Sequence, residues 1–257
     1  MLLVVDIGNT NITLGIYDGT QLLGSFRLTT KMQRTSDEFG IVIHNFLMTK
    51  QIQPSQIEDV IISSVVPKVM HSFNNSIRKY INVEPIIIGP GTKTGISVKT
   101  EFPKEVGTDR VVNAAAVYEY YGGPSLIIDF GTATTFDYIN AAGEFLYVII
   151  SPGLEISAQA LWTQTAKLPE IEIKKLDSIL TRNTITSMQA GVVFGYIGQV
   201  EYIINQVKKE LNQSMQVIAT GGLGRIIFNE TNSIDIYDAD LTFKGMKVIY
   251  DKLKKNL

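Results

Sequence analysis

The stretch LVVDIGNT, residues 3–10, decides the fold, because its pattern returns in the second half of the chain as LIIDFGTATT, residues 126–135. Each copy is an apolar run that ends in a carboxylate, Asp6 or Asp129, followed by glycine and small polar residues. The run predicts a buried strand, and the glycine lets the following turn approach a ligand closely. For a single copy, an ordinary strand-to-turn connection is the better explanation. The repetition favours two turns that face each other across a cleft, hold a polyphosphate and use their carboxylates to bind metal ions.

Length and composition restrict the possible functions. The 257 residues can form one large domain or two smaller ones, and 45% hydrophobic and 19% charged residues are typical of a globular protein. A net charge of -2 predicts no nucleic-acid or anionic-membrane partner. The absence of cysteine excludes disulfides, thiolate zinc sites and a cysteine nucleophile. No apolar run approaches the roughly 20 residues that span a bilayer, so we expect no membrane partner and a cytoplasmic location.

The order of the predicted elements is similar in the two halves of the chain. In each half, strands in hairpin order come first, and alternating strands and helices follow. We therefore expect an α/β protein of two related domains with mixed sheets, residues 1–121 and 122–257. The predicted helices are 35–46, 108–121, 153–166, 184–211 and 243–254, with a further helix that follows a loop after Pro67 and ends near Tyr80, and residues 89–110 are predicted to form an extended loop.

The sequence Gly107-Thr108-Asp109-Arg110 precedes the predicted helix 108–121. A helix start offers unpaired N–H groups to an anion or a hydroxyl. The carboxylate can accept a proton from an attacking hydroxyl, and the guanidinium can hold a phosphoryl or carboxylate oxygen. Taken alone, an acidic residue that simply stabilises a helix start beside its arginine is the simpler interpretation.

Two glycine patterns have both structural and functional interpretations. Gly221-Gly222-Leu223-Gly224 follows a β run and would let a flat ring, such as adenosine, lie on bare backbone, although a plain tight turn explains it equally well. Three glycines at 191, 195 and 198 form a stripe on a predicted helix, at a cost of about 1 kcal/mol each relative to alanine. Close helix–helix packing is the simplest compensation.

Several further motifs strengthen a family resemblance that covers essentially the whole chain. They are DIGNTN at 6–11, SSVVP at 63–67, PKEVGTDR at 103–110, DFGTATT at 129–135, PGL at 152–154, AKLP at 166–169, NT at 183–184 and TGGL at 220–223. With them the sequence resembles the type III pantothenate kinases, of the acetate and sugar kinase/Hsp70/actin superfamily. The resemblance implies two duplicated ribonuclease H-like (actin-like ATPase) domains with a cleft between them. It also implies ATP-dependent phosphorylation of pantothenate to 4'-phosphopantothenate, the first step towards coenzyme A.

The resemblance also implies roles for individual residues. Asp109 looks like the general base, and Thr184 of the partner subunit of a homodimer is expected to reach the substrate. Asp129 would bind a monovalent cation, K⁺ or NH₄⁺, and Asp6 would bind Mg²⁺, directly or through water. The pantothenate site would comprise Phe102, Gly107, Thr108, Asp109, Arg110 and Thr184. The ATP site would comprise Asp6, Ile7, Gly8, Asn9, Thr10, Asn11, Ile12, Thr13, Thr132, Gly221 and Gly222.

The sequence departs from the family pattern at three places. Thr108 stands where alanine is common, Phe102 where tyrosine is frequent, and Tyr147-Val148 where the family has two glycines. The bulk at 147–148 would alter how closely the second domain approaches the nucleotide. Two other functions share the fold: a kinase for another small alcohol, and a non-catalytic nucleotide-sensing regulator. All three aspartates are present, which favours an enzyme.

Overall fold

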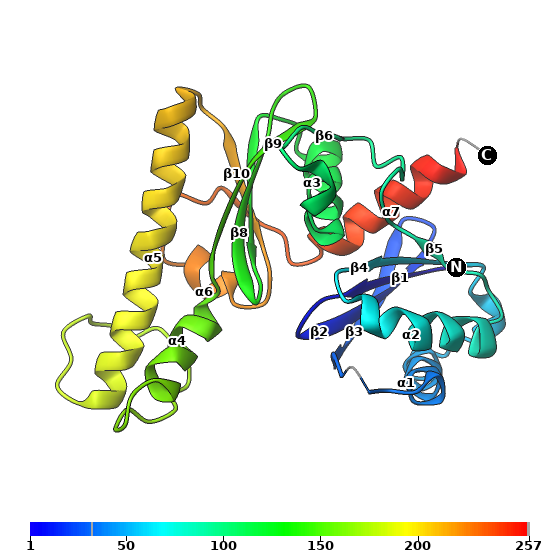
Figure 1. The fold of residues 1–257 in the computed structure, drawn as a ribbon, viewed down its shortest axis with the longest axis horizontal. Helices are drawn as coiled ribbons and strands as arrows, with labels where there is room; N and C mark the ends of the chain where they lie inside the picture. The colour runs from blue at the N-terminus through cyan, green and yellow to red at the C-terminus, as the bar shows by residue number, and fades with distance from the viewer. Residues whose placement is uncertain (32, 256–257) are drawn as a thin grey trace. The chain divides into compact units, whose positions relative to one another are not determined.

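The computed structural model describes residues 1–31 and 33–255, and its contacts group them into two compact units. The first unit comprises Met1–Ile96, Phe102–Ala116 and the C-terminal residues from Thr242 onward. The second comprises Ser97–Glu101 and Val117–Leu241. Figure 1 shows the elements of both units. Each unit is built around one mixed sheet.

The first unit contains a five-stranded sheet in the order β3-β2-β1-β4-β5. The three strands β1 to β3 form an antiparallel meander, and β4 and β5 are parallel to β1. The strands are β1 Leu2–Ile7, β2 Asn11–Asp18, β3 Gln21–Thr29, β4 Asp59–Ser64 and β5 Ile86–Ile87. Its helices are α1 Ser36–Thr49, α2 Pro67–Tyr80, the first part of α3 Thr108–Tyr120 and all but the first residue of α7 Leu241–Lys254, with 3-10 turns at Pro54–Gln56 and Pro103–Glu105.

Both faces of β1 are covered, which explains its continuous apolar run. Side chains alternate along a strand, so Leu3 and Val5 join the core that α1 and α2 form with the sheet. Leu2 and Val4 join the opposite core, to which α3 and α7 contribute. The helix α1 begins with a capping box: the Thr35 hydroxyl accepts from the N–H of Glu38, and the Glu38 carboxylate accepts from the N–H of Thr35.

The second unit repeats this plan and extends it. Its sheet has the order β11-β10-β7-β8-β9-β6, in which β7 to β9 form the antiparallel meander and β10 and β11 run parallel to β7. The strands are β6 Ser97–Val98, β7 Ser125–Phe130, β8 Ala133–Ile139, β9 Glu144–Pro152, β10 Gln216–Thr220 and β11 Ile236–Tyr237. The helices are α4 Leu154–Thr163, α5 Thr184–Leu211 and α6 Gly224–Phe228. One face of this sheet packs against α5 (Figure 1).

The repeated strand order confirms the duplicated α/β fold, of the ribonuclease H-like type, that the sequence predicts. Strands β7, β8, β9, β10 and β11 correspond in order and direction to β1 to β5. The long helix α5 has the predicted bounds, and β10 is the β run that precedes Gly221. The extra strand β6 is an addition to the plan and pairs in parallel with the start of β9.

Some elements differ from the sequence-based expectation. Residues 89–110 are not one extended loop, because they contain β6 and a 3-10 turn. The C-terminal helix α7 packs in the first unit, where Phe243 and Met246 contact the core around Val4 and Val112. The division of the sequence into residues 1–121 and 122–257 describes the repeated halves and stays a prediction. Within the part of the chain that the structure describes, no helix is long and apolar enough to cross a membrane.

Candidate active site

The first repeated turn joins β1 to β2 and is closed by backbone hydrogen bonds. The N–H of Gly8 donates to the carbonyl of Asn11 across 2.9 Å. Thr30, the residue after β3, also bonds to this turn. Its hydroxyl donates to the Gly8 carbonyl at 2.7 Å, and its N–H donates to the Thr10 carbonyl at 2.8 Å. Asn9 and Thr10 remain exposed at the tip. These hydrogen bonds therefore fix the backbone of the turn, while its tip is accessible to a ligand.

Asp6 lies just before this turn, between two hydroxyl side chains. In the strand register it is opposite Thr13 of β2 and opposite Ser63 of β4. The second unit repeats the arrangement, since Asp129 at the end of β7 is opposite Thr135 of β8 and Thr220 of β10. Each unit thus presents a carboxylate flanked by hydroxyls at the end of its central strand. The sequence analysis identified the carboxylates but not all of the flanking hydroxyls.

The second repeated turn is covered on one side by the start of α4. The N–H of Gly153 donates to the carbonyl of Thr132 at 3.1 Å, and a Cβ at position 153 would overlap that carbonyl. Only glycine allows the helix to begin so close to the turn. The hydroxyl of Tyr196, on α5, lies within hydrogen-bonding distance of both the Thr134 hydroxyl and the Pro152 carbonyl, and so connects the turn to α5. Burial raises the pKa of this tyrosine, so it remains a neutral donor.

The glycine pair after β10 lies beside the end of β7. Gly221 has φ +99°, and a Cβ there would lie 2.6 Å from the carbonyl oxygen of Phe130. Both its conformation and its close approach therefore require glycine. Because Thr220 pairs with Asp129, the structure brings the predicted adenosine-binding glycines close to the second turn. Gly222 is exposed beside them.

Asp109 lies in the first turn of α3, partly buried. Its Oδ1 accepts a hydrogen bond from the N–H of Arg110 at 2.9 Å. Burial raises the pKa of the Asp109 carboxyl, and the N–H and positive charge of Arg110 partly oppose that shift. A carboxylate with a raised pKa is a better proton acceptor, which suits a general base. Gly107 lies directly under this carboxylate, and a Cβ at Gly107 would overlap Oδ1.

The start of α3 is attached to the end of β4. The hydroxyl of Thr108 donates to the carbonyl of Ser64 at 3.0 Å and accepts from the hydroxyl of Ser63 at 3.2 Å. Within the first unit, the structure therefore connects the Gly107–Arg110 segment to the strand beside β1, which carries Asp6. Phe102 is 58% exposed, and its ring is available to a ligand.

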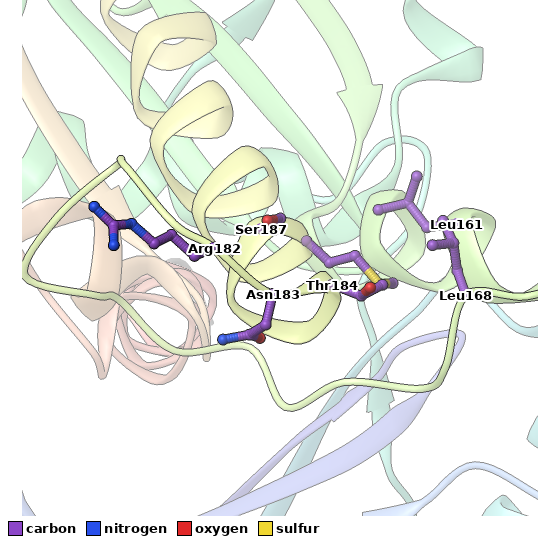
Figure 2. Close-up of a pocket in the computed structure, with 7 residues that line it drawn as sticks. Leu161, Leu168, Arg182, Asn183, Thr184 and Ser187 are labelled. Atoms are coloured by element: carbon purple, nitrogen blue, oxygen red, sulfur yellow. The ribbon is translucent and has the colours of Figure 1, made fainter.

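Thr184 lines a different feature, an open pocket of about 540 Å³ at the beginning of α5 (Figure 2). The pocket has an apolar side and a polar side; its lining residues are Leu161, Leu168, Arg182, Asn183, Thr184, Ser187 and Met188. The side chain of Asn183 caps α5 by accepting from the N–H of Thr186. With a rise of 1.5 Å per residue, Thr184 lies about 18 Å along the helix from Tyr196. The structure therefore separates Thr184 from the second turn of its own unit.

The glycine stripe of α5 faces outward. Gly191, Gly195 and Gly198 are exposed, and a Cβ on any of them would meet no other atom within 4 Å. The predicted close packing is thus not made by the described residues of this chain. Apolar side chains are also exposed on β9, including Tyr147 at 55% and Ile150 at 62%.

Comparison with known proteins identifies the family. The model of the type III pantothenate kinases matches residues 2–206. A type III pantothenate kinase of Agathobacter rectalis is 56% identical over 98% of this chain and 97% of its own length. This chain belongs to the type III pantothenate kinase family. The family resemblance expected from the motifs is therefore confirmed.

Solved structures share the fold of this pantothenate kinase family member at low sequence identity. A Campylobacter jejuni protein assigned to the Baf family of transcriptional activators is 22% identical, with a TM-score of 0.60 over 99% of this chain and 100% of that one. The activator of 2-hydroxyisocaproyl-CoA dehydratase from Clostridium difficile, solved with bound ADPNP, is 13% identical, with a TM-score of 0.54 over 100% of this chain and 97% of that one. At these identities the likeness shows the fold alone.

Proposed function

We propose that this chain transfers the γ-phosphoryl group of ATP to the primary hydroxyl of pantothenate, with Asp109 as the general base. The reaction follows from membership of the type III pantothenate kinase family, and its product, 4'-phosphopantothenate, begins coenzyme A biosynthesis. The assignment of the base is carried by one observation: a partly buried carboxylate with a raised pKa stands at the start of α3, beside Arg110. We also propose a cytoplasmic location, where ATP is available.

The two repeated turns are proposed to bind the same nucleotide. Residues 6–13 and Thr132 would hold the phosphates through backbone N–H groups and hydroxyls, and Gly221 and Gly222 would lie against the adenosine. The exposed tips at Asn9 and Thr10, and the positive φ of Gly221, support this assignment.

Mg²⁺ accompanies ATP in a kinase, and the residues present fit that ion. It prefers oxygen ligands and is commonly held by one or two carboxylates together with phosphates and water. Asp6, flanked by Thr13 and Ser63, supplies such a carboxylate. The phosphates of ATP and water would supply the remaining ligands. The bound ion would neutralise charge on the transferred group.

We further propose that Asp129 binds K⁺ or NH₄⁺. The position is chemically suitable because its neighbours Thr135 and Thr220 offer oxygen atoms without additional charge. Replacing K⁺ with Na⁺ should lower the turnover of the natural enzyme. The substitution Asp129→Asn should remove that difference, and an unchanged response to K⁺ in this variant would contradict the assignment.

The proposed reaction proceeds by direct transfer. The oxygen of the pantothenate hydroxyl attacks the γ-phosphorus while the bond from that phosphorus to the bridging oxygen of ADP breaks. The proton of the hydroxyl passes to the carboxylate of Asp109. Arg110 holds an oxygen of the substrate, and Phe102, Gly107 and Thr108 complete the proposed pocket. Phosphoryl transfer depends mainly on positioning and on charge stabilisation, which is what these groups supply.

Asp109→Asn tests the base assignment. It should lower kcat by about 10²–10⁴, the usual contribution of general acid–base catalysis, and leave the KM for pantothenate close to that of the natural enzyme. Near-normal turnover would exclude Asp109 as the base. Glycerol, sugars and acetate assayed beside pantothenate would detect another kinase activity on the same fold. A nucleotide-sensing regulator would bind ATP without releasing ADP when pantothenate is added.

We propose that the active form is a homodimer in which Thr184 of the partner subunit contacts pantothenate. Three features support this proposal: the outward glycine stripe of α5, the exposed apolar side chains of β9, and the distance of the Thr184 pocket from the second turn. Mixing two inactive variants, Asp109→Asn and Thr184→Arg, tests it. Mixed dimers would contain one intact site, so activity should reappear after the subunits exchange. No recovery in mixtures that demonstrably contain heterodimers would contradict a shared site.

A further inference from the structure

The side-chain hydroxyl of Thr108 makes its hydrogen bonds to other residues of the protein. A hydroxyl has one proton to donate, and that of Thr108 is donated to the carbonyl of Ser64 at 3.0 Å. Its oxygen also accepts from Ser63, which is fully buried. The hydroxyl therefore links α3 to two successive residues at the end of β4.

The same strand end continues to the first repeated turn. The N–H of Val65 donates to the carbonyl of Ile7 at 3.1 Å, and Ser63 is opposite Asp6 in the strand register. Thr30 fastens the far side of that turn through Gly8. These hydrogen bonds, joined through the backbone of β4 and β1, connect the residue before Asp109 to the turn that follows Asp6, all within the first unit.

We propose that Thr108 is a positioning residue: its hydroxyl fixes the first turn of α3, and with it the carboxylate of Asp109, relative to the turn that carries Asp6. The inference rests on the proposed function, because the position of Asp109 matters for turnover only if that carboxylate accepts the substrate proton. It assigns the side chain of Thr108 an inward role and leaves the substrate contacts of this segment to its backbone and to its neighbours. An alanine at position 108 could make neither hydrogen bond.

The geometry explains why one hydroxyl has this effect. The carboxylate of Asp109 accepts from the N–H of the next residue, Arg110, in the same first turn of α3, so this bond moves with the helix start. A helix end is the part of a helix that moves most easily, because its first N–H groups have no partners within the helix. The bonds to Ser63 and Ser64 connect that end to a central strand of the sheet, which is buried on both faces.

The test compares Thr108→Val, which keeps the shape and removes the hydroxyl, with Thr108→Ser, which keeps the hydroxyl. Thr108→Val should lower kcat by roughly three- to tenfold, the equivalent of one net hydrogen bond, with little change in the KM for pantothenate. Thr108→Ser should restore most of the lost kcat. The matched control is Thr49→Val, which removes a hydroxyl bonded to the Phe46 carbonyl at the end of α1 and should not alter kcat.

Three results would overturn the inference. If Thr108→Val raises the KM for pantothenate and leaves kcat unchanged, the hydroxyl contacts the substrate. If it lowers only the melting temperature, the role of the hydroxyl is purely structural. If it changes none of these quantities, the hydroxyl has no role. If Thr108→Val does not fold, Thr108→Ala replaces it, because it removes the same bonds and leaves space for a water molecule.

A double-mutant cycle separates this inference from the proposed function. If Thr108 acts through Asp109, adding Thr108→Val to Asp109→Asn should cause little further loss of residual activity. If Thr108→Val lowers kcat by the same factor in the natural enzyme and in Asp109→Asn, the positioning role is refuted and the base assignment stands. Near-normal turnover of Asp109→Asn alone would refute the base assignment, and the inference about Thr108 with it.

Discussion

Gly107→Ala should separate catalysis from stability, because it disturbs little besides the carboxylate of Asp109. A Cβ at position 107 would overlap Oδ1 of Asp109, and the next atom it meets, a methyl of Val65, lies at an ordinary contact distance of 3.4 Å. To restore van der Waals contact the carboxylate must move by about 1 Å. A displacement of that size in a reacting group costs about 10²-fold in rate, so kcat should fall about a hundredfold.

The stability of this variant should change little. Moving the carboxylate weakens its hydrogen bond from Arg110, which lowers the free energy of unfolding by about 1 kcal/mol. Replacing glycine by alanine raises it by about 0.4–1 kcal/mol where alanine can adopt the same backbone conformation, because the unfolded chain loses conformational freedom. ADP release at saturating ATP and pantothenate measures kcat, and urea unfolding measures stability. Gly89→Ala is the control, because a Cβ there meets no atom within 4 Å. A Gly107→Ala enzyme that retains half of its kcat would refute the proposed position of the base.

Three further predictions concern stability. Burial raises the pKa of Asp109 above its ordinary 3.8, so ionisation of this carboxyl destabilises the fold as the pH rises. Asp109→Asn should therefore raise the free energy of unfolding at pH 7. Urea unfolding at a series of pH values should show this gain disappear as the pH falls towards 3.8. Gly221→Ala should cost at least about 2 kcal/mol in urea unfolding, since it combines a positive φ with overlap on the Phe130 backbone, and a smaller loss would contradict the described turn. Thr35→Ala removes the hydroxyl that accepts from the Glu38 N–H and should cost about 1 kcal/mol, with kcat unchanged.

Much of the fold could be predicted because its signals are local. Apolar runs ending in Asp6 and Asp129 predict the central strands, and the capping box at Thr35 predicts the start of α1. The strand β6 has only two residues, too few to show a hydrophobic period, and its position depends on pairing with β9. The packing of α7 in the first unit depends on long-range contacts, which a local pattern does not report.

The candidate site was predicted unevenly for a similar reason. Residues that follow a strand and precede a turn, such as Asp6 and Asp129, can be recognised from spacing alone. Their flanking hydroxyls become visible only when the strand register is known, because Thr13 and Ser63 lie far apart in the sequence. The inward bonds of Thr108 needed the structure in the same way.

The packing of the last helix has a consequence for how the protein is made. Phe243, Met246 and Ile249 of α7 share a buried cluster with Leu2 and Val4, which are synthesised long before them. While the chain is on the ribosome, one face of the sheet that contains β1 is uncovered until α7 has been synthesised. The first unit therefore reaches its native state only after α7 emerges, and a chain terminated before α7 would expose the apolar surface that chaperones and proteases recognise.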